Sequence, residues 1–425
     1  MKPIIKAAKG TRDILPEESC KWQFLENLLS SEAAIFGFSQ IRTPVFEHTE
    51  LFLRSVGETS DVVQKEMYTF TDKGGRSITL RPEGTAGKVR ALIEHALYNR
   101  GFPIKLYYFD SCYRYEKPQA GRFREFYQFG AEIYGSASPI ADAELIYMLC
   151  SIFSRLRIER LSLEINSIGC QECRSEYHKA LYDYFDKQKM HLCDTCLNRL
   201  ERNPMRILDC KNPNCNGLIE NAPIILNFIC KPCEDHFKQV KNYLEIANIA
   251  YTVNPKIVRG LDYYTRTVFE FKFEDMCSKN TVCGGGRYDK LLEELGTAPT
   301  PALGFGMGIE RLLMLLENQG IKLPSLEACD LYIATIGENS RILALNLAKI
   351  AREASIKTEY DLVERSLKAQ MKYADKIGAK LVLVLGDEEL EKKQASLKNM
   401  KTGELSPIHL DDEFFVDLLK IQTKI

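Results

Sequence analysis

Hydrophobic and polar positions follow two different periods in the first part of the chain. From Trp22 to Phe36, apolar residues recur three or four positions apart, which predicts an amphipathic helix. From Arg124 to Tyr134, aromatic and polar residues alternate instead, as in a half-buried β-strand. Apolar runs at residues 77–80 and 106–113 predict two further strands. Because such alternation suits an antiparallel sheet with one functional face, residues 1–165 are predicted to be mixed α/β.

The middle of the chain changes character. Eight of the fourteen cysteines lie within residues 170–233, and helical periodicity surrounds them at residues 175–188 and 235–247. Strand and glycine patterns return at residues 254–316. The region 168–250 is therefore predicted to be a cysteine-rich helical insertion in a larger domain.

The C-terminal part has the pattern of a separate domain. A linker is predicted at residues 320–326, where Pro324 interrupts the pattern. Beyond it, a strand, two helices and a strand are predicted at residues 330–336, 340–354, 366–377 and 381–385. This order predicts a small parallel α/β domain.

Composition narrows the class of protein. The chain has 425 residues, 45% apolar and 27% charged, which fits a globular protein of two or three domains. Its formal net charge is −1, so any contact with nucleic acid must come from local basic patches. The N-terminus carries no apolar run typical of a signal peptide, and no run approaches the length of a membrane span. We therefore expect a cytoplasmic protein whose cysteines are free thiols or metal ligands.

Two segments near the predicted hairpin carry groups that suit charged ligands. Arg114 and Glu116 stand at the entrance of the loop 117–124. An arginine fork fits a phosphate or carboxylate, whereas Glu116 suits an amine or a metal ion. The segment Glu83–Thr85 follows a strand and suits a substrate ammonium group. Taken alone, an ion-paired hairpin and a solvated turn are the favoured interpretations.

Three later segments combine glycine with arginine. Val258–Arg266 joins Arg259 to paired tyrosines, and Thr281–Asp289 contains three glycines whose N–H groups suit an anion. Gly304–Leu312 is a glycine-rich strand that leads into a helix with Arg311 in its first turn, where the helix dipole favours anions. An aromatic core strand, a bend or bulge, and a tightly packed helix entry are the structural alternatives.

Together these segments resemble a class II aminoacyl-tRNA synthetase. Residues 113–134 and 304–312 resemble the second and third motifs of that class, and Ile41–Phe46 resembles the first, which builds the dimer interface in the family. IVRGLDYYTRTVFEF, from Ile257, and TVCGGGRYD, from Thr281, are similar to the signature segments of histidyl-tRNA synthetases and their relatives. The N-terminal KGTRDILP also resembles that family, so the resemblance covers essentially the whole chain.

The resemblance implies two domains and a homodimer. Residues 1–325 are expected to form a class II catalytic domain on an antiparallel sheet, with the helical insertion inside it, and residues 326–425 an α/β anticodon-binding domain. One basic face of that domain would carry Arg365, Lys368, Lys372, Lys376 and Lys380, if the stretch is continuously helical. A solvated helix face explains these residues equally well. The loop 117–124 is a second candidate for contact with tRNA(His).

The resemblance also implies the reaction, ATP-dependent ligation of L-histidine to tRNA(His) through a histidyl-adenylate, with release of AMP and pyrophosphate. The catalytic residues would be Arg114, on the α-phosphate and the substrate carboxylate, and Arg259, where related synthetases place a metal ion. Arg311 would hold the γ-phosphate, Phe126 would stack on adenine, and Glu116 would contact its amino group. Mg²⁺ would bridge the ATP phosphates.

Histidine binding is carried over in the same way. The matching positions are Glu83, Gly84, Thr85, Arg114, Gln128, Glu132, Arg259, Tyr263 and Tyr264. Of these, Glu83, Thr85 and Gln128 match the ammonium-binding set, and Glu132 and Tyr264 match the imidazole-binding pair. A buried carboxylate facing the imidazole would reject apolar side chains, because they would leave it unpaired.

The cysteine-rich region forms four close pairs. They are Cys170 and Cys173, Cys193 and Cys196, Cys210 and Cys215, and Cys230 and Cys233. This spacing is typical of structural zinc, with enough thiolates for two sites of four, although it leaves open which pairs share a metal. A set of reduced structural thiols is the alternative.

Three other functions compete with the synthetase. A non-catalytic paralogue that regulates histidine biosynthesis would lack the anticodon-binding domain and lose signature residues, whereas this chain keeps Arg114, Arg259 and Arg311 and has about a hundred residues after the linker. A class II synthetase for another amino acid is disfavoured by the LDYY and GGGRYD segments. The third is a zinc-ribbon RNA-binding protein on an inactive scaffold.

Overall fold

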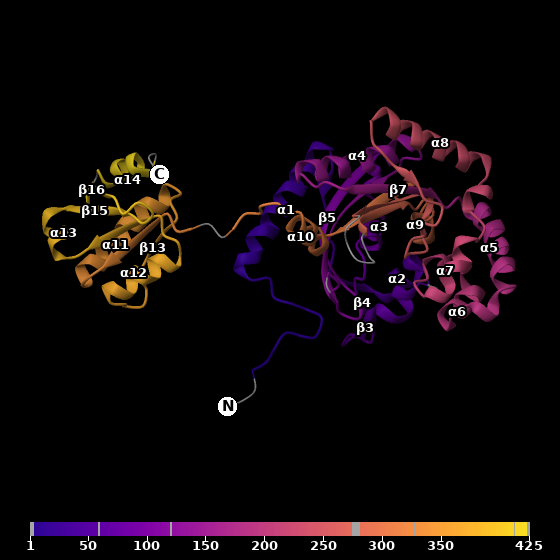
Figure 1. Cartoon of the computed structure of the whole chain (residues 1–425), viewed down its shortest axis with the longest axis horizontal. Coiled ribbons are helices and arrows are strands. Elements are labelled where there is room, and N and C mark those ends of the chain that lie inside the picture. Colours follow the sequence, from indigo (N-terminus) through magenta and orange to yellow (C-terminus); the bar gives the residue numbers. More distant parts are fainter. Residues whose placement is uncertain are drawn as a thin grey trace. The chain divides into compact units, whose positions relative to one another are not determined.

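The computed structural model divides into two compact units, Met1–Pro324 and Ser325–Ile425 (Figure 1). It describes residues 4–57, 60–119, 121–273, 281–325, 328–411 and 413–422. Within these ranges, no helix is both long enough and apolar enough to cross a lipid bilayer. The boundary between the units falls in the segment predicted as a linker, whose last residue lies outside the described residues.

An eight-stranded sheet forms the centre of the first unit. Its strand order is β1-β5-β6-β11-β10-β9-β7-β8. The strands are β1 (Ser39–Gln40), β5 (Ile104–Tyr113), β6 (Glu125–Tyr134), β7 (Leu161–Ser167), β8 (Thr252–Val253), β9 (Thr265–Phe273), β10 (Thr281–Arg287) and β11 (Ala302–Gly308). From β5 to β7 each neighbouring pair is antiparallel, and the edge strands β1 and β8 pair in parallel. The antiparallel core predicted from the alternating pattern is therefore confirmed.

Helices cover one face of this sheet. They are α1 (Pro16–Ile35), α4 (Pro139–Arg155), α8 (Lys231–Ile246) and α10 (Ile309–Asn318). Their apolar residues share one core with alternate strand residues, among them Phe129 and Ala131 of β6. Because neighbouring side chains of a strand point to opposite faces, Gln128 and Glu132 point away from these helices. The polar side chains of β6 therefore lie on the face of the sheet that these helices do not cover.

A three-stranded sheet and two helices lie beside that opposite face. They are β2 (Phe46–His48), β3 (Tyr68–Thr71), β4 (Ser77–Leu80), α2 (Thr49–Val56) and α3 (Thr85–Glu94). The turn between β4 and α3 is tied to the large sheet by charge, because Arg81 and Lys88 both pair with the buried Asp110 of β5. A buried carboxylate with two cationic partners is compensated for the loss of water. This contact fixes the turn that carries Glu83 and Thr85.

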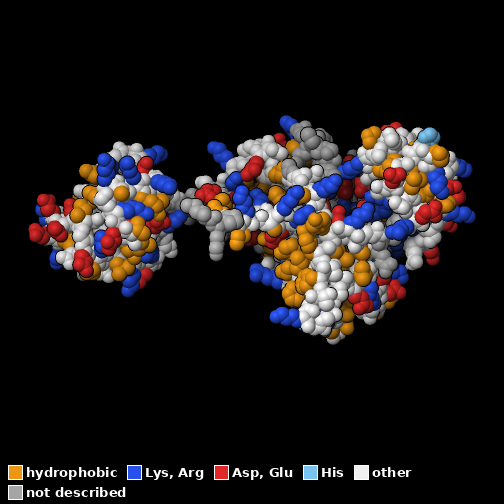
Figure 2. Space-filling model, turned by 90° about the horizontal axis from the view of Figure 1, so that it is seen from below, with side chains coloured by type: hydrophobic (Ala, Val, Ile, Leu, Met, Phe, Trp, Pro, Cys, Tyr) orange, Lys and Arg blue, Asp and Glu red, His pale blue; other side chains and the backbone are white. Residues whose placement is uncertain are grey.

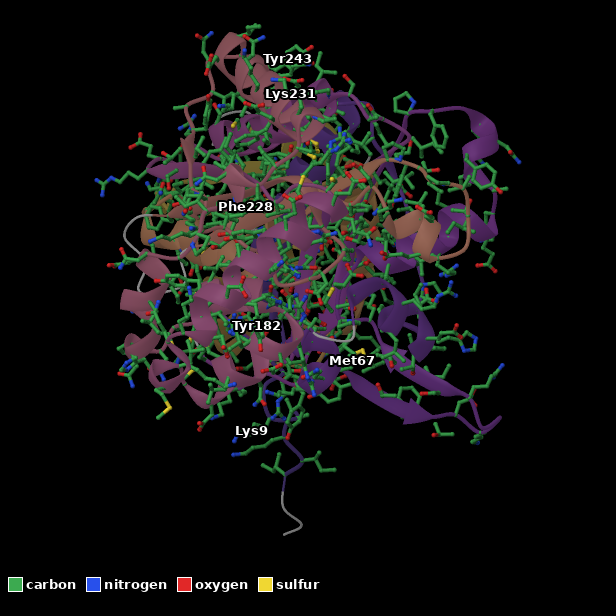
Figure 3. All side chains as sticks on the ribbon, turned by 90° about the vertical axis from the view of Figure 1, so that its right-hand side faces the viewer. Lys9, Met67, Tyr182, Phe228, Lys231 and Tyr243 are labelled. Carbon is green, nitrogen blue, oxygen red and sulfur yellow. The ribbon has the colours of Figure 1, made fainter. Side chains whose placement is uncertain are left out.

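The cysteine-rich region forms a helical insert between β7 and β8. Its elements are α5 (Gln171–Asp186), η3 (Lys189–His191), α6 (Asp194–Arg202), η4 (Pro204–Asp209), α7 (Pro213–Glu220), η5 (Ile225–Asn227) and α8. Cys170, Cys193 and Cys230 directly precede α5, α6 and α8. Figure 3 views the insert face-on, with Tyr182 of α5 and Phe228 labelled. Because β8 pairs with β7, the chain leaves and re-enters the sheet at the same edge.

The second unit contains a five-stranded sheet of order β13-β12-β14-β15-β16. Its elements are β12 (Leu331–Thr335), α11 (Glu338–Glu353), β13 (Thr358–Tyr360), α12 (Leu367–Lys376), β14 (Leu381–Leu385), α13 (Asp387–Lys392), β15 (Gln394–Asn399), β16 (Leu405–His409) and α14 (Phe414–Gln422). The first three strands of this order are parallel, but β14, β15 and β16 are antiparallel. The prediction of a parallel sheet was therefore incomplete, because the polar strand β15 has little apolar signal.

The predicted basic face of this unit is shorter than expected. Lys368, Lys372 and Lys376 share α12, but the helix does not extend to the two outer residues. Arg365 pairs with Asp361, and Lys380 pairs with Asp330 at 2.7 Å. The condition for one basic face of five residues, a continuous helix from Arg365 to Lys380, is therefore not met.

Candidate active site

Two adjoining cavities open on the polar face of the large sheet. The first, which we call the arginine pocket, has a volume of about 240 Å³, and the second, the tyrosine pocket, about 370 Å³. Both are lined by Arg114, Glu116, Arg122, Gln128, Arg259, Gly284 and Gly306. The shared lining makes them two parts of one site.

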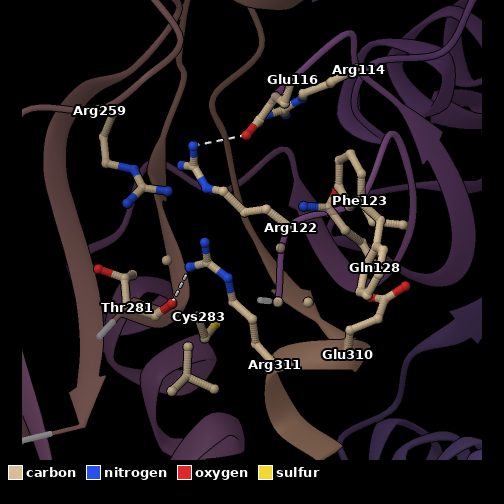
Figure 4. A pocket seen from close by; sticks show the side chains of 16 residues that line it. Arg114, Glu116, Arg122, Phe123, Gln128, Arg259, Thr281, Cys283, Glu310 and Arg311 are labelled. Atoms are coloured by element: carbon tan, nitrogen blue, oxygen red, sulfur yellow. Dashed lines mark hydrogen bonds and ion pairs between the residues drawn. The ribbon is translucent and has the colours of Figure 1, made fainter. Parts of the chain in front are cut away.

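Four guanidinium groups from separate segments line the arginine pocket. Arg114 follows β5, Arg122 lies in the loop before β6, Arg259 precedes β9, and Arg311 is in the first turn of α10. Figure 4 shows the guanidinium groups of Arg122, Arg259 and Arg311 facing one common space. The predicted convergence of Arg114, Arg259 and Arg311 is therefore observed as geometry. Such a concentration of positive charge suits a polyanion.

Arg311 shows the electrostatic cost of this crowding. Its Nη1 donates a hydrogen bond to the carbonyl oxygen of Thr281 at 2.6 Å. Burial lowers the pKa of Arg311, and the neighbouring guanidinium groups of Arg122 and Arg114 lower it further. An anion in the pocket would offset this lowering, because a nearby negative charge favours the charged form of Arg311.

Arg259 reaches the cavity across a glycine. Its Nη1 lies 2.5 Å from Oε1 of Glu270, and its guanidinium carbon lies 5.4 Å from the centre of the Tyr264 ring. A Cβ on Gly284 would stand 2.4 Å from the same Nη1. The Nε of Arg259 is buried and makes no hydrogen bond to the described residues. A donor left in this state is available to a ligand.

The backbone N–H groups of the β10 glycines are not free to bind an anion, contrary to one interpretation of the sequence. The strand is paired with β9 on one side and β11 on the other, so its amide groups belong to the sheet. The idea that these N–H groups cradle an anion was therefore wrong. Glycine is required here because a Cβ on Gly284 would meet the Arg259 side chain, and a Cβ on Gly285 or Gly286 would meet a main-chain oxygen of a neighbouring strand.

The predicted adenine-binding residues, Phe126 and Glu116, both line the arginine pocket. Arg114 donates from Nε to the carbonyl oxygen of Pro82 at 2.8 Å, and its guanidinium carbon lies 5.3 Å from the centre of the Phe126 ring. Glu116 pairs with Arg122 at 2.8 Å. Glu116 therefore has Arg122 as a cationic partner. The guanidinium group of Arg114 covers one face of the Phe126 ring.

The segment Glu83–Thr85 lines the tyrosine pocket together with Tyr263 and Tyr264. The Glu83 side chain is buried and accepts hydrogen bonds from the backbone N–H groups of Thr85 at 2.8 Å and Ala86 at 2.7 Å. Burial nevertheless raises the pKa of Glu83. The interpretation of this segment as a solvated turn was wrong, and its carboxylate favours a cationic ligand.

Glu132 lies one layer behind the wall of the tyrosine pocket. Its carboxylate is fully buried and accepts hydrogen bonds from the hydroxyl groups of Thr85 at 2.9 Å, Tyr108 at 2.9 Å and Tyr288 at 2.5 Å. A Cβ on Gly304 would stand 1.5 Å from Oε2. Burial raises the pKa of Glu132 to about 8. Thr85 and Tyr108, which line the pocket, therefore stand between Glu132 and a ligand, a change from the predicted direct contact.

Sequence reasoning missed several groups of this site. Arg122 was noted only as part of a loop with a possible RNA contact, although its guanidinium group faces the arginine pocket. Tyr108 and Tyr288 were not singled out, yet both bond to Glu132. Tyr108 sits in an apolar-looking strand and Tyr288 beside three glycines, so neither carried a local signal of its own.

Comparison with known proteins identifies the family and the fold. A sequence model of histidyl-tRNA synthetases matches residues 10–312, and a model of an anticodon-binding domain matches residues 330–420. The histidine–tRNA ligase of Caldanaerobacter subterraneus subsp. tengcongensis is 52% identical over 409 residues, which cover 96% of this chain and 98% of that one. The chain belongs to the histidyl-tRNA synthetase family. The histidine–tRNA ligase of Clostridium novyi agrees, with 51% identity over 98% of this chain and all of its own.

Solved structures of the histidyl-tRNA synthetase family agree over the whole chain. The crystal structure of apo Staphylococcus aureus histidyl-tRNA synthetase matches with a TM-score of 0.82 and 42% identity, over 98% of this chain and 100% of that one. An ATP phosphoribosyltransferase regulatory subunit/histidyl-tRNA synthetase of Bacillus halodurans matches with a TM-score of 0.65 at 24% identity, over 88% of this chain and 97% of that one. The second likeness shows the fold alone. The predicted family and its class II architecture are therefore confirmed.

The eight cysteines of the helical insert gather in two groups of four. The first cluster contains Cys170, Cys173, Cys230 and Cys233, and the second contains Cys193, Cys196, Cys210 and Cys215. Within each cluster all four Sγ atoms lie within 4.8 Å of one another. Two cysteines of each cluster are buried and two are half-buried. The structure thus shows which close pairs of cysteines lie together, a question that their spacing in the sequence left open.

The proton on Glu132 predicts a pH-dependent stability difference. The folded synthetase keeps this proton up to pH about 8, whereas an ordinary glutamate loses it near 4.5, so its contribution to stability falls as pH rises through this window. The slope is at most about 1.4 kcal/mol per pH unit. Glu132→Gln, which does not titrate, should therefore become more stable relative to the unsubstituted protein between pH 5.5 and 8, as measured by urea unfolding.

The exposed Glu176 provides the control for this measurement. Glu176→Gln should change the free energy of unfolding by the same small amount at both pH values. A Glu132→Gln difference that does not vary with pH would mean that Glu132 is ionised in the folded protein.

Proposed function

We propose that this chain joins L-histidine to tRNA(His) through a histidyl-adenylate made from ATP. The carrying observation is the convergence of Arg114, Arg122, Arg259 and Arg311 on one pocket, beside a second pocket walled by Glu83 and paired tyrosines. The first pocket suits a triphosphate, and the second suits a small cationic amino acid.

Activation requires a carboxylate to attack the α-phosphorus of ATP and to displace pyrophosphate. Two anions approach each other, so fixed positive charge aimed at the transition state lowers the barrier. Arg259 and Arg114 take this role at the α-phosphate and the histidine carboxylate, and Arg311 holds the γ-phosphate. The buried, unpaired Nε of Arg259 supports its assignment. Mg²⁺ enters with ATP as part of the substrate, bound mostly by phosphate oxygens and water.

The adenine is held at the other end of the arginine pocket. Its ring stacks on the face of Phe126 that is turned away from Arg114, and its amino group donates to Glu116. The position of Phe126 and Glu116 in the pocket lining supports both roles. Binding of ATP then requires Arg122 to share Glu116 with the base or to turn toward the phosphates.

The tyrosine pocket binds the amino acid by its two polar ends. Glu83, Thr85 and Gln128 take the ammonium group, and the raised pKa of Glu83 supports a cationic ligand, since a positive charge would restore its ionised form. Glu132 and Tyr264, with Tyr263 alongside, recognise the imidazole. For Glu132 the link runs through the hydroxyl groups of Thr85 and Tyr108, which both donate and accept hydrogen bonds.

The partners and the setting of the enzyme follow from the same assignment. The second unit binds the anticodon arm of tRNA(His), and the loop 117–124 meets its acceptor end. Two copies assemble through the segment Ile41–Phe46, where Val45 and Phe46 are 38% and 57% exposed. Figure 2 views the side of β3 and β4 and shows hydrophobic side chains gathered there in orange. A cytoplasmic enzyme fits the free thiols of the insert.

The test is amino-acid-dependent exchange between ATP and pyrophosphate. The purified chain should catalyse exchange with histidine and with none of the other nineteen amino acids, and it should then charge tRNA(His). Exchange with a different amino acid would support another class II synthetase. Absence of exchange with all twenty would support a regulatory or binding role.

Arg259→Ala should lower the rate of histidine-dependent exchange on the order of 10²-fold or more, because a donor to the transition state is lost. The effect should fall mainly on kcat, since Arg311 still holds the triphosphate. Arg266→Ala is the matched control, because Arg266 is a nearby arginine outside the lining of both pockets. Near-normal exchange in Arg259→Ala would remove Arg259 from the mechanism.

Each cysteine cluster also fits a structural zinc ion. Zinc with four thiolates at about 2.3 Å places the sulfur atoms about 3.8 Å apart. The Sγ atoms of Cys170 and Cys173 are 3.5 Å apart, those of Cys170 and Cys230 are 3.9 Å apart, and those of Cys193 and Cys210 are 3.8 Å apart. Such an ion would cross-link the insert, because the four thiolates of each cluster come from two separate segments of it.

Metal analysis of protein purified without oxygen should find two zinc ions per chain. Cys196→Ser should lower the content to one, because it removes a thiolate from the second cluster alone. Cys20→Ser, outside both clusters, should keep two. Preparations without stoichiometric zinc would support reduced structural thiols instead.

A further inference from the structure

The segment that carries Arg259 has no helix or strand of its own. It lies between β8 and β9, and residues 257–264 are turns and irregular backbone. The amide and carbonyl groups of such a segment find partners outside regular structure. In this chain, the partners of several of its carbonyl oxygens are arginine side chains of the helical insert.

Arg206 of η4 makes the closest of these contacts. Its Nη1 donates to the carbonyl oxygen of Arg259 at 3.1 Å, and its Nη2 donates to the carbonyl oxygen of Gly260 at 2.6 Å. Its Nε also lies 3.6 Å from Oδ1 of Asp262. The Arg206 side chain is 8% exposed. A guanidinium fork that binds two successive carbonyl groups fixes the orientation of the peptide between them.

Arg206 is itself held by the insert. Arg199 of α6 donates from Nη1 to the carbonyl oxygen of Arg206 at 3.0 Å, and from Nη2 to Asp61 at 2.9 Å. The residues on either side of this segment, Cys196 and Cys210, belong to the second cysteine cluster. The hydrogen bond from Arg199 and the cysteines on either side of η4 therefore fix the position from which the Arg206 side chain extends.

Arg174 of α5 makes a second contact of the same kind. Its Nη1 donates to the carbonyl oxygen of Tyr264 at 3.1 Å and that of Asp262 at 3.4 Å. It directly follows Cys173 of the first cluster. The two arginines thus hold the two ends of the segment that presents Arg259 and Tyr264 to the cavity.

We propose that Arg206 is a positioning residue for histidine activation, through which the insert holds Arg259 in its working place. The inference rests on the proposed function and names a further residue on which that function depends. Arg259 passes over Gly284 in a slot without room for a Cβ and ends 2.5 Å from Glu270. A small shift of its main chain therefore moves its guanidinium group out of line, and misplacements of about 1 Å cost up to about 10²-fold in rate.

Arg206→Met tests this role, since it keeps the apolar stem and removes all donors. The kcat for histidine-dependent exchange should fall about 10- to 100-fold. The KM for ATP should change less than about threefold, because Arg114 and Arg311 lie on other segments. Amide hydrogen exchange at residues 258–264 should become faster, while zinc content and the melting temperature stay close to those of the unsubstituted protein.

Two further variants separate positioning from charge. Arg206→Lys keeps the charge but not the fork, so it should recover kcat only in part and leave exchange at residues 258–264 faster. Arg202→Met, an exposed position at the end of α6, should leave every readout unchanged. If Arg206→Met does not fold, Arg206→Gln takes its place with the same readouts, because its amide is too short to reach both carbonyl groups.

An Arg206→Met protein with unchanged kcat and unchanged amide exchange at residues 258–264 would overturn the proposal. A full recovery by Arg206→Lys, with unchanged amide exchange, would also overturn it in favour of a purely electrostatic effect. The proposed function fails on a separate result, the lack of histidine-dependent exchange in the unsubstituted chain. In that case, amide exchange still reports whether Arg206 holds the segment.

Discussion

The repulsion among guanidinium groups in the arginine pocket is the constraint on which the site depends. Arg259 and Arg122 each have one carboxylate partner, Glu270 and Glu116. Within the described residues, the Arg311 guanidinium group instead donates its hydrogen bond to a carbonyl oxygen. The cluster is therefore short of negative charge until an anion arrives. Such an arrangement persists only if the surrounding structure holds each guanidinium group in place, since otherwise the groups would move apart.

The antiparallel sheet supports this arrangement and leaves space for the side chains that form it. Its central strands carry glycine where side chains must cross them, as at Gly284 beneath Arg259 and Gly304 beside Glu132. A parallel sheet with helices on both faces would have no open polar face of this kind. The open face of the sheet thus leaves space for the arginine pocket, while the helices on the opposite face bury the apolar half of each strand.

Sequence reasoning succeeded where the signal was local. The alternation in β6 and the helix α10 were predicted because periodicity and a helix entry need only neighbouring residues. It failed where the answer depended on distant partners. The three-hydroxyl cage of Glu132 joins β5, α3 and the residue after β10, and the cysteine pairing depends on how the insert folds back. The antiparallel strands of the second unit were not predicted for a local reason, because β15 is mostly polar and lacks the apolar residues that indicate a strand.

The insert begins and ends at one edge of the large sheet, where β7 and β8 lie next to each other. Closing a loop whose two ends already adjoin costs little more as the loop grows, about 0.6 kcal/mol for each doubling of its length. Segments of different size or content can therefore occupy this place without disturbing the register of the sheet. The insert can therefore be exchanged for another segment without a change in the sheet. Any such segment can affect catalysis if one of its side chains binds the backbone that precedes β9.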